Sequence, residues 1–277
     1  MTRAGRIGAV VLALGVAACG TKGHEKKDGL TAHNSPYSFH RSIATTLLRT
    51  HQYEKAVAHI RRMLASGPDE PEPHYLLARA FLGMELKWEA QQEIGRSLKL
   101  DKEYAPAHAL KGVILDGQKK HKRAEKAHRR AIKLAPKVSN YHNNLGFCLF
   151  LQERYKEAAK AYRKGLAIRP TSRRINNNLA FALARLGKPG EALKHFRLAG
   201  EEAEAQNNMG LAHEMAGELD RAYHYYFLAV EGARLDEAKV NLTRVCRKLG
   251  RPLPRLLHDQ RGPSSLPAGP PEEKGKQ

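Results

Sequence analysis

The sequence repeats itself at intervals of 34 residues. When the chain is shifted against itself by this distance, six alanines fall into register, the last after only 30 residues. They are Ala56, Ala90, Ala124, Ala158, Ala192 and Ala222. A fixed period of this size indicates small supersecondary units that stack, because no unit can bury its apolar face alone. The 277 residues therefore predict an array of units and not one or two ordinary domains.

Each unit carries two apolar stripes at helical spacing. The stretch 139–172 has small residues, Gly146 and Ala158, where two helices would cross, and ends near Pro170. Small side chains let paired helices approach to about 8 Å. A single Trp and 6% aromatic residues suit packing of helix on helix better than a sheet sandwich. The sequence predicts an all-α chain.

The pattern resembles the tetratricopeptide repeat, whose signature combines Leu-Gly, spaced aromatics, Ala and a closing Pro. Pairs equivalent to Leu-Gly include Leu77-Ala78 and Leu145-Gly146, and closing prolines include Pro68 and Pro136. The resemblance implies a right-handed solenoid of about six helix-turn-helix repeats. Counted so that the alanine falls at position 20, the repeats span 37–70, 71–104, 105–138, 139–172, 173–202, and a sixth from 203.

The repeats end in a helix and a tail. Repeat five is four residues short, which predicts the loss of about one turn from its second helix or the following loop. A capping helix is predicted over 236–249, with Val240, Leu242, Val245 and Leu249 covering the open end. The predicted solenoid is 37–250, and the Pro/Gly-rich tail 251–277 is predicted to be disordered, with Leu253, Leu256 and Leu257 able to dock on the cap.

The N-terminus has the order of a secretory signal. Arg3 and Arg6 precede an uncharged run of about twelve residues, too short to span a bilayer. The run ends in Val-Ala-Ala-Cys19, which resembles the lipobox of bacterial lipoproteins. The resemblance implies removal of residues 1–18, acylation of Cys19 and a lipid anchor in the outer membrane, facing the periplasm. Residues 19–36, polar and Gly-rich, are expected to be a flexible tether.

The family places its peptide-binding groove on the first helix, helix A, of each repeat, at positions 2, 5, 9, 12 and 13, and often adds an Asn at position 6. The resemblance therefore implies that repeats four to six bind an extended or helical peptide through amides and exposed rings. The alternative is that the groove residues follow the family consensus only for packing. The predicted groove residues are Asn143, Asn144, Phe147, Phe150, Arg174, Asn177, Asn178, Phe181, Arg185, Asn207, Asn208, Leu211 and Met215.

The second helix of repeat three is unusually basic. Its cations form a surface that we call the basic ridge: Lys119, Lys120, Lys122, Arg123, Lys126, Arg129, Arg130 and Lys133. Together with the formal charge of +20, the ridge predicts attraction to anionic lipid or an acidic protein. A solvated helix face without a ligand is the alternative.

Other candidates point to packing. His40, His74, His108 and His142 recur at position 4, where they replace the family's aromatic residue. Cys148 is expected to be a buried thiol, as is Cys246. The sequence contains no nucleophile elbow, phosphate-binding loop or paired CxxC, so we expect no catalytic site, metal or cofactor.

The last three repeats look most like the lipoproteins of Tad-type (Flp) pilus and secretion systems, and the architecture is similar to that of secretin pilotins. The leading hypothesis is an outer-membrane scaffold that binds secretin, pilin or another envelope protein. Recruitment of murein hydrolases or other periplasmic enzymes is one alternative. Nucleic-acid binding, suggested by charge alone, is disfavoured because stacking aromatics are few.

Overall fold

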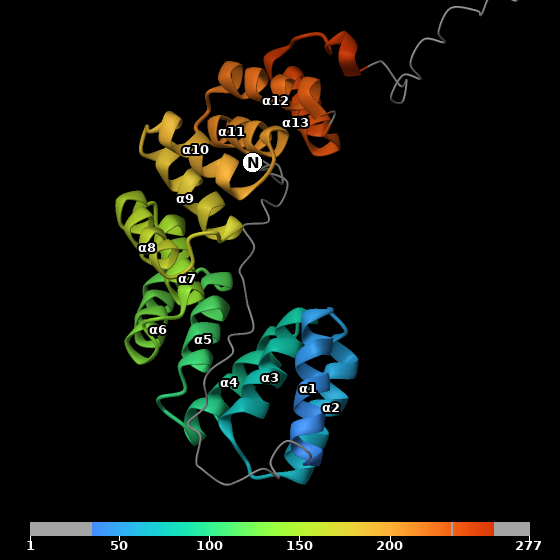
Figure 1. Cartoon of the computed structure of the whole chain (residues 1–277), viewed down its shortest axis with the longest axis vertical. Coiled ribbons are helices and arrows are strands. Elements are labelled where there is room, and N and C mark those ends of the chain that lie inside the picture. The colour runs from blue at the N-terminus through green and yellow to red at the C-terminus, as the bar shows by residue number, and fades with distance from the viewer. Residues whose placement is uncertain (1–34, 234, 258–277) are drawn as a thin grey trace, which may run out of the picture. The chain divides into compact units, whose positions relative to one another are not determined.

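The computed structural model describes residues 35–233 and 235–257 (Figure 1). The predicted signal segment, Cys19, nearly all of the predicted tether and most of the tail lie outside these residues. The chain divides after Gly200 into two compact bodies. The prediction of an all-α chain is confirmed, since every regular element of the described residues is helical.

The first body contains the helix pairs of repeats one to five. Each odd-numbered helix is helix A of its repeat and packs against the following helix B, and each helix B packs against the next helix A (Figure 1). The helices are α1 (Pro36–Arg49), α2 (Tyr53–Ser66), α3 (Pro71–Gly83), α4 (Lys87–Leu100), α5 (Ala105–Gly117), α6 (His121–Leu134), α7 (Ser139–Leu151), α8 (Tyr155–Ile168), α9 (Arg173–Arg185) and α10 (Pro189–Ala199).

Local sequence sets the helix ends. Proline occupies the first turn of four helices, where its missing N–H costs no hydrogen bond. Between helices A and B the chain turns through one left-handed residue, which is a non-glycine residue in repeats one to four, with φ of 59–62°. Repeat five uses Gly187 there, at φ 72°, and so avoids the strain that a Cβ brings.

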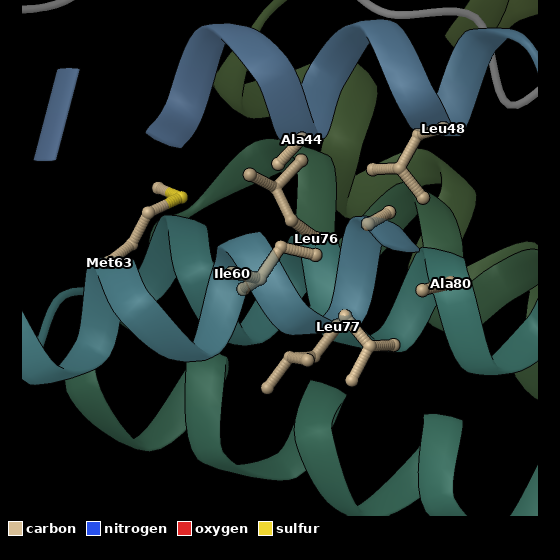
Figure 2. Close-up of a cluster of buried hydrophobic side chains, with 9 residues drawn as sticks. Ala44, Leu48, Ile60, Met63, Leu76, Leu77 and Ala80 are labelled. Atoms are coloured by element: carbon tan, nitrogen blue, oxygen red, sulfur yellow. The ribbon is translucent and has the colours of Figure 1, made fainter. Parts of the chain in front are cut away.

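The core lies between helices A and B and between adjacent repeats. Ala44, Ile60, Leu76 and Ala80 belong to the cluster that joins repeats one and two (Figure 2). The alanines at position 20 are fully buried in all six repeats. This burial confirms the predicted register, because a larger side chain at these points would hold the helices apart.

The second body holds repeat six and the cap. Its elements are α11 (Glu202–Met215), α12 (Leu219–Ala233), α13 (Asp236–Leu249) and a short 3-10 helix, η2 (Arg255–Leu257). The bounds of α13 match those predicted for the capping helix, and Leu242 and Val245 are fully buried. The predicted role of Val240 is wrong: it is 64% exposed, because two residues along a helix turn a side chain to the opposite face. Leu257 packs against the buried cluster of α12 and α13 that includes Leu242 and Val245, whereas Leu253 is exposed.

Repeat five is shorter both in helix B and in the following loop, which has two residues (200–201) in place of the four that follow each earlier helix B. Helix α10 has 11 residues, whereas α2, α4, α6 and α8 have 14 each. The boundary between the two bodies follows directly at Gly200.

Among the described residues, no helix is both long and apolar enough to cross a bilayer.

Candidate functional site

The aromatic residues predicted to line the groove are buried. Phe147, Phe150 and Phe181 are each less than a tenth exposed. The Phe181 ring meets Phe196 edge to face at 4.9 Å, and the Phe150 ring meets Tyr155 in the same way at 5.2 Å. The prediction of exposed rings is therefore wrong, because α7 and α9 direct these side chains at their own helix B.

Several predicted amides are paired between helices. Asn178 of α9 donates to the Oδ1 of Asn143 in α7 at 2.9 Å, and Asn207 of α11 accepts at 2.9 Å from Asn241 of the capping helix α13. Asn241 is not one of the predicted groove residues. Asn144 is buried as well, and its Oδ1 has no partner in the described structure. Asn143, Asn178 and Asn207 thus use hydrogen bonds inside the fold, as the alternative packing role implies.

The remaining predicted groove residues are half-buried. Arg174 donates to the Oδ1 of Asn140 at 2.7 Å, and the Arg185 guanidinium lies 5.0 Å from the centre of the Tyr155 ring. Burial lowers the pKa of Arg174 from its ordinary value. The other half-buried members are Asn177, Asn208, Leu211 and Met215. Arg174 and Arg185 thus contact neighbouring helices of the first body.

A hollow at the groove positions lies instead in repeats one to three. It has a volume of about 370 Å³ and lies between α1, α3 and α5. Position 12 contributes Leu48 and Leu82, position 9 contributes Arg79 and Val113, and position 13 contributes Gly83 and Gly117; His51, Tyr53, Lys87 and Ile114 complete the lining. The sequence carried one signal for it, the repeated glycine at position 13.

Gly117 makes the open side of this hollow. A Cβ built on Gly117 meets no atom within 4 Å, whereas one built on Gly83 would lie 2.3 Å from the Tyr53 ring. Gly83 is thus needed for packing, while Gly117 leaves space. A larger side chain at Gly117 would enter the hollow without displacing the core.

The rim of the hollow is basic. Arg79 and Lys87 line it, no Asp or Glu of the described chain does, and its surface is mostly apolar. The Arg79 guanidinium lies 5.7 Å from the centre of the Tyr75 ring, which orients the charge. The chemistry fits an apolar side chain flanked by acidic groups.

Sequence models described as the tetratricopeptide repeat match residues 42–84, 105–138 and 139–172. The chain is a tetratricopeptide-repeat protein. No curated protein matches its sequence. The matched models describe a repeat and indicate no enzyme family.

Several solved structures share this tetratricopeptide fold. Pseudomonas aeruginosa PilF has a TM-score of 0.61 at 18% identity and covers 77% of this chain and 97% of its own. PilW, described as a widely conserved type IV pilus biogenesis factor, has a TM-score of 0.63 at 19% identity and covers 76% and 97%. YrrB, described as a tetratricopeptide protein with an unusual peptide-binding site, has a TM-score of 0.50 at 18% identity and covers 65% and 95%. At these identities the likeness concerns the fold.

The basic ridge of this tetratricopeptide protein faces outward, as predicted. Seven of its eight cations are exposed and Arg130 is half-buried. Arg129 pairs with Glu125 at 2.7 Å, and Arg130 pairs with Glu103 at 2.9 Å. Binding of lipid or acidic protein to the ridge stays a prediction.

The histidines at position 4 hold helices and loops in place. His74 contacts Glu93 at 2.6 Å and Asp69 at 2.8 Å. His108 and His142 each donate from Nε2 to a carbonyl of the preceding loop at 2.9 Å. His40 meets the ring nitrogen of His59 at 3.1 Å. Each ring thus takes the place of the family's aromatic residue and gains a polar contact.

The two described cysteines are free and buried, as predicted. Burial raises the pKa of the Cys148 and Cys246 thiols, so both are protonated near neutral pH. Neither has the lowered pKa of a reactive cysteine.

Proposed function

We propose that this chain is a protein-binding scaffold that holds a segment of a partner in the groove formed by α1, α3 and α5. The hollow beside Gly117 carries the proposal. Its volume of about 370 Å³ lies near the lower end of ligand pockets, roughly 300–1,000 Å³, and suits one or two apolar side chains of a bound peptide. Arg79 and Lys87 favour a partner segment with acidic residues beside this anchor.

The proposed partner is a component of a cell-envelope assembly, either a pilin or a secretin subunit. Two observations support this proposal: the fold is shared with PilF and PilW over about three quarters of the chain, and the N-terminal pattern ends in a lipobox-like Cys19. In this proposal acylated Cys19 anchors the protein in the outer membrane, and the repeats face the periplasm. The scaffold would then meet subunits after they cross the inner membrane.

Filling the hollow tests the binding proposal. Gly117→Leu places an apolar side chain in the space that a partner side chain would occupy. We expect this variant to lose cross-linking to pilin or secretin in the host and to lose surface pili. The matched control is Gly190→Leu. A Cβ built on Gly190 also meets no atom within 4 Å, and Gly190 lies in α10, away from the hollow.

Two results would contradict these proposals separately. Unchanged cross-linking and piliation in a folded Gly117→Leu variant would remove the hollow as the binding site. An intact Met1 on the protein isolated from its host, in place of a diacylated or triacylated Cys19, would remove the anchor. The mass of the N-terminal peptide decides the second point.

A further inference from the structure

Three side chains of different chemistry meet in the interior between repeats three and four. They are Asp116 at the end of α5, His128 in α6 and Cys148 in α7, and one ligand atom of each lies within 4.8 Å of the others. The Asp116 and His128 side chains are 1% and 0% exposed, and Cys148 is 0% exposed. A carboxylate, an imidazole and a thiol are therefore enclosed together without solvent.

A fourth group closes the cluster toward solvent. The Nε2 of His128 lies 2.9 Å from Oδ2 of Asp116, and the Nδ1 of His121 lies 2.9 Å from the other oxygen, Oδ1. The sulfur of Cys148 lies 3.4 Å from the backbone oxygen of His121. The His121 side chain is 24% exposed, so the cluster borders solvent at this residue.

These residues depart from the repeat pattern at the positions that meet. The position of His128 is held by Ile, Tyr or Phe in the other five repeats, and the position of Cys148 is held by Thr, Ala or Ile. Repeat six has an acid at the position of Asp116 but pairs it with a tyrosine: Tyr226 donates to Glu214 at 2.7 Å. A Glu–Tyr pair satisfies the repeat without any metal-binding nitrogen.

Packing holds the His128 ring in one place. A Cβ built on Gly112 would lie 2.3 Å from Cε1 of His128, so the ring lies flat against the backbone of α5. The Nδ1 of His128 is buried and has no hydrogen-bond partner in the described structure. For packing alone, the tyrosine used by repeats four and six would bury more apolar surface, so the imidazole calls for a second explanation.

We propose that Asp116, His128 and Cys148 bind a zinc ion, with His121 as the fourth ligand. One sulfur, two imidazole nitrogens and one carboxylate oxygen are the donor types that Zn²⁺ takes in tetrahedral sites. Zinc–ligand distances of about 2.0–2.3 Å place the donor atoms of such a site about 3.3–3.8 Å apart. The ligand atoms of Asp116, His128 and Cys148 lie within 4.8 Å of one another, so they need to approach by at most about 1–1.5 Å to reach that spacing.

Binding must release a proton from the thiol. Burial and the nearby Asp116 raise the pKa of Cys148, so this side chain is a thiol when the site holds no metal. Zinc binds the thiolate, and the proton passes to solvent as the Zn–S bond forms.

The test measures metal binding by the purified, chelator-stripped full chain. We expect one Zn²⁺ per chain by native mass spectrometry, and with Co²⁺ the absorption of a tetrahedral site with a thiolate ligand. Cys148→Ser and His128→Tyr should each lower the affinity at least about 100-fold, since even supporting residues around a metal cost 10–100-fold when changed. Cys246→Ser, which alters the other buried thiol, should leave binding unchanged.

The His128→Tyr variant separates loss of metal binding from loss of the fold. Tyr162 and Tyr226 occupy the same position over Gly146 and Gly210, and repeat three already has Gly112 there. We therefore expect this variant to keep its helical circular dichroism while it loses metal. Absence of stoichiometric zinc in the wild type, or binding retained in both Cys148→Ser and His128→Tyr, would overturn the proposal and leave a buried hydrogen-bond network.

Discussion

Replacing Gly146 with alanine tests how closely the two helices of a repeat approach. The added Cβ would lie 2.5 Å from Cε1 of Tyr162 and 2.7 Å from its Cδ1. Because Tyr162 is fully buried, its ring has no free space to enter, and overpacking of this kind costs about 1–3 kcal/mol. Alanine regains about 0.8–1.0 kcal/mol of helix propensity over glycine. We therefore expect the free energy of unfolding to fall by up to about 2 kcal/mol.

Urea denaturation followed by circular dichroism measures this change, with Gly95→Ala as the matched control. Gly95 lies within α4, and a built Cβ there meets nothing within 4 Å, so this variant should gain about 0.5–1 kcal/mol. Repeat two pairs an alanine, Ala78, with isoleucine at the ring position, so adding Tyr162→Ile should recover part of the loss. A Gly146→Ala protein as stable as Gly95→Ala would refute the reasoning.

Two further changes follow from the structure. Glu153→Gly should raise the free energy of unfolding by about 0.5–1 kcal/mol in urea melts, because Glu153 has a φ of 59°, a conformation that glycine adopts without a Cβ penalty; Gly187→Ala, at φ 72°, should lower it. Although burial opposes it, hydrogen bonds from Arg244, Lys248 and Tyr226 lower the pKa of Glu214 to about 2. This carboxylate therefore stabilises the fold above its unfolded pKa of about 4.5 and loses that effect as the pH falls toward 2. At pH 7 the free energy of unfolding of the wild type should exceed that of Glu214→Gln by about 1–3 kcal/mol, and this advantage should shrink as the pH falls from 4.5 toward 2. An advantage that did not change with pH would contradict the second prediction.

The sequence predicted the helices well because the repeat period and the apolar spacing both depend on local order. The predicted capping helix has the same first and last residues as α13. Its helical spacing of apolar residues begins after Leu235 and stops before Gly250, which adopts φ 65°. The single failure inside it, Val240, came from counting apolar residues without asking which face each one takes.

The candidate site was harder to predict because it depends on which repeats meet. Position numbers taken from the family placed Phe147 and Phe181 in a groove, but a position does not tell how closely the neighbouring helices enclose it. The hollow lies between three helices of different repeats, and Gly117 leaves space beside it. The cluster of Asp116, His128 and Cys148 joins residues from three helices in two repeats, and only the packed structure brings them together.

Polar contacts between adjacent helices A that occur in one pair of repeats alone give this periodic chain a way to keep its repeats in order. Stacked units with similar apolar stripes can exchange neighbours during folding with little loss of buried apolar surface. Repeat six has Asn208 at the position of Asn178, so the hydrogen bond to Asn143 does not tell these two repeats apart. The hydrogen bond of Arg174 to Asn140 does, because repeat six has Glu204 at the position of Arg174, and losing a buried partner costs about 1–3 kcal/mol. Individual polar contacts thus fix the order of the repeats. Exchanging whole repeats within this array would lower the stability of the fold more than their similar backbones suggest.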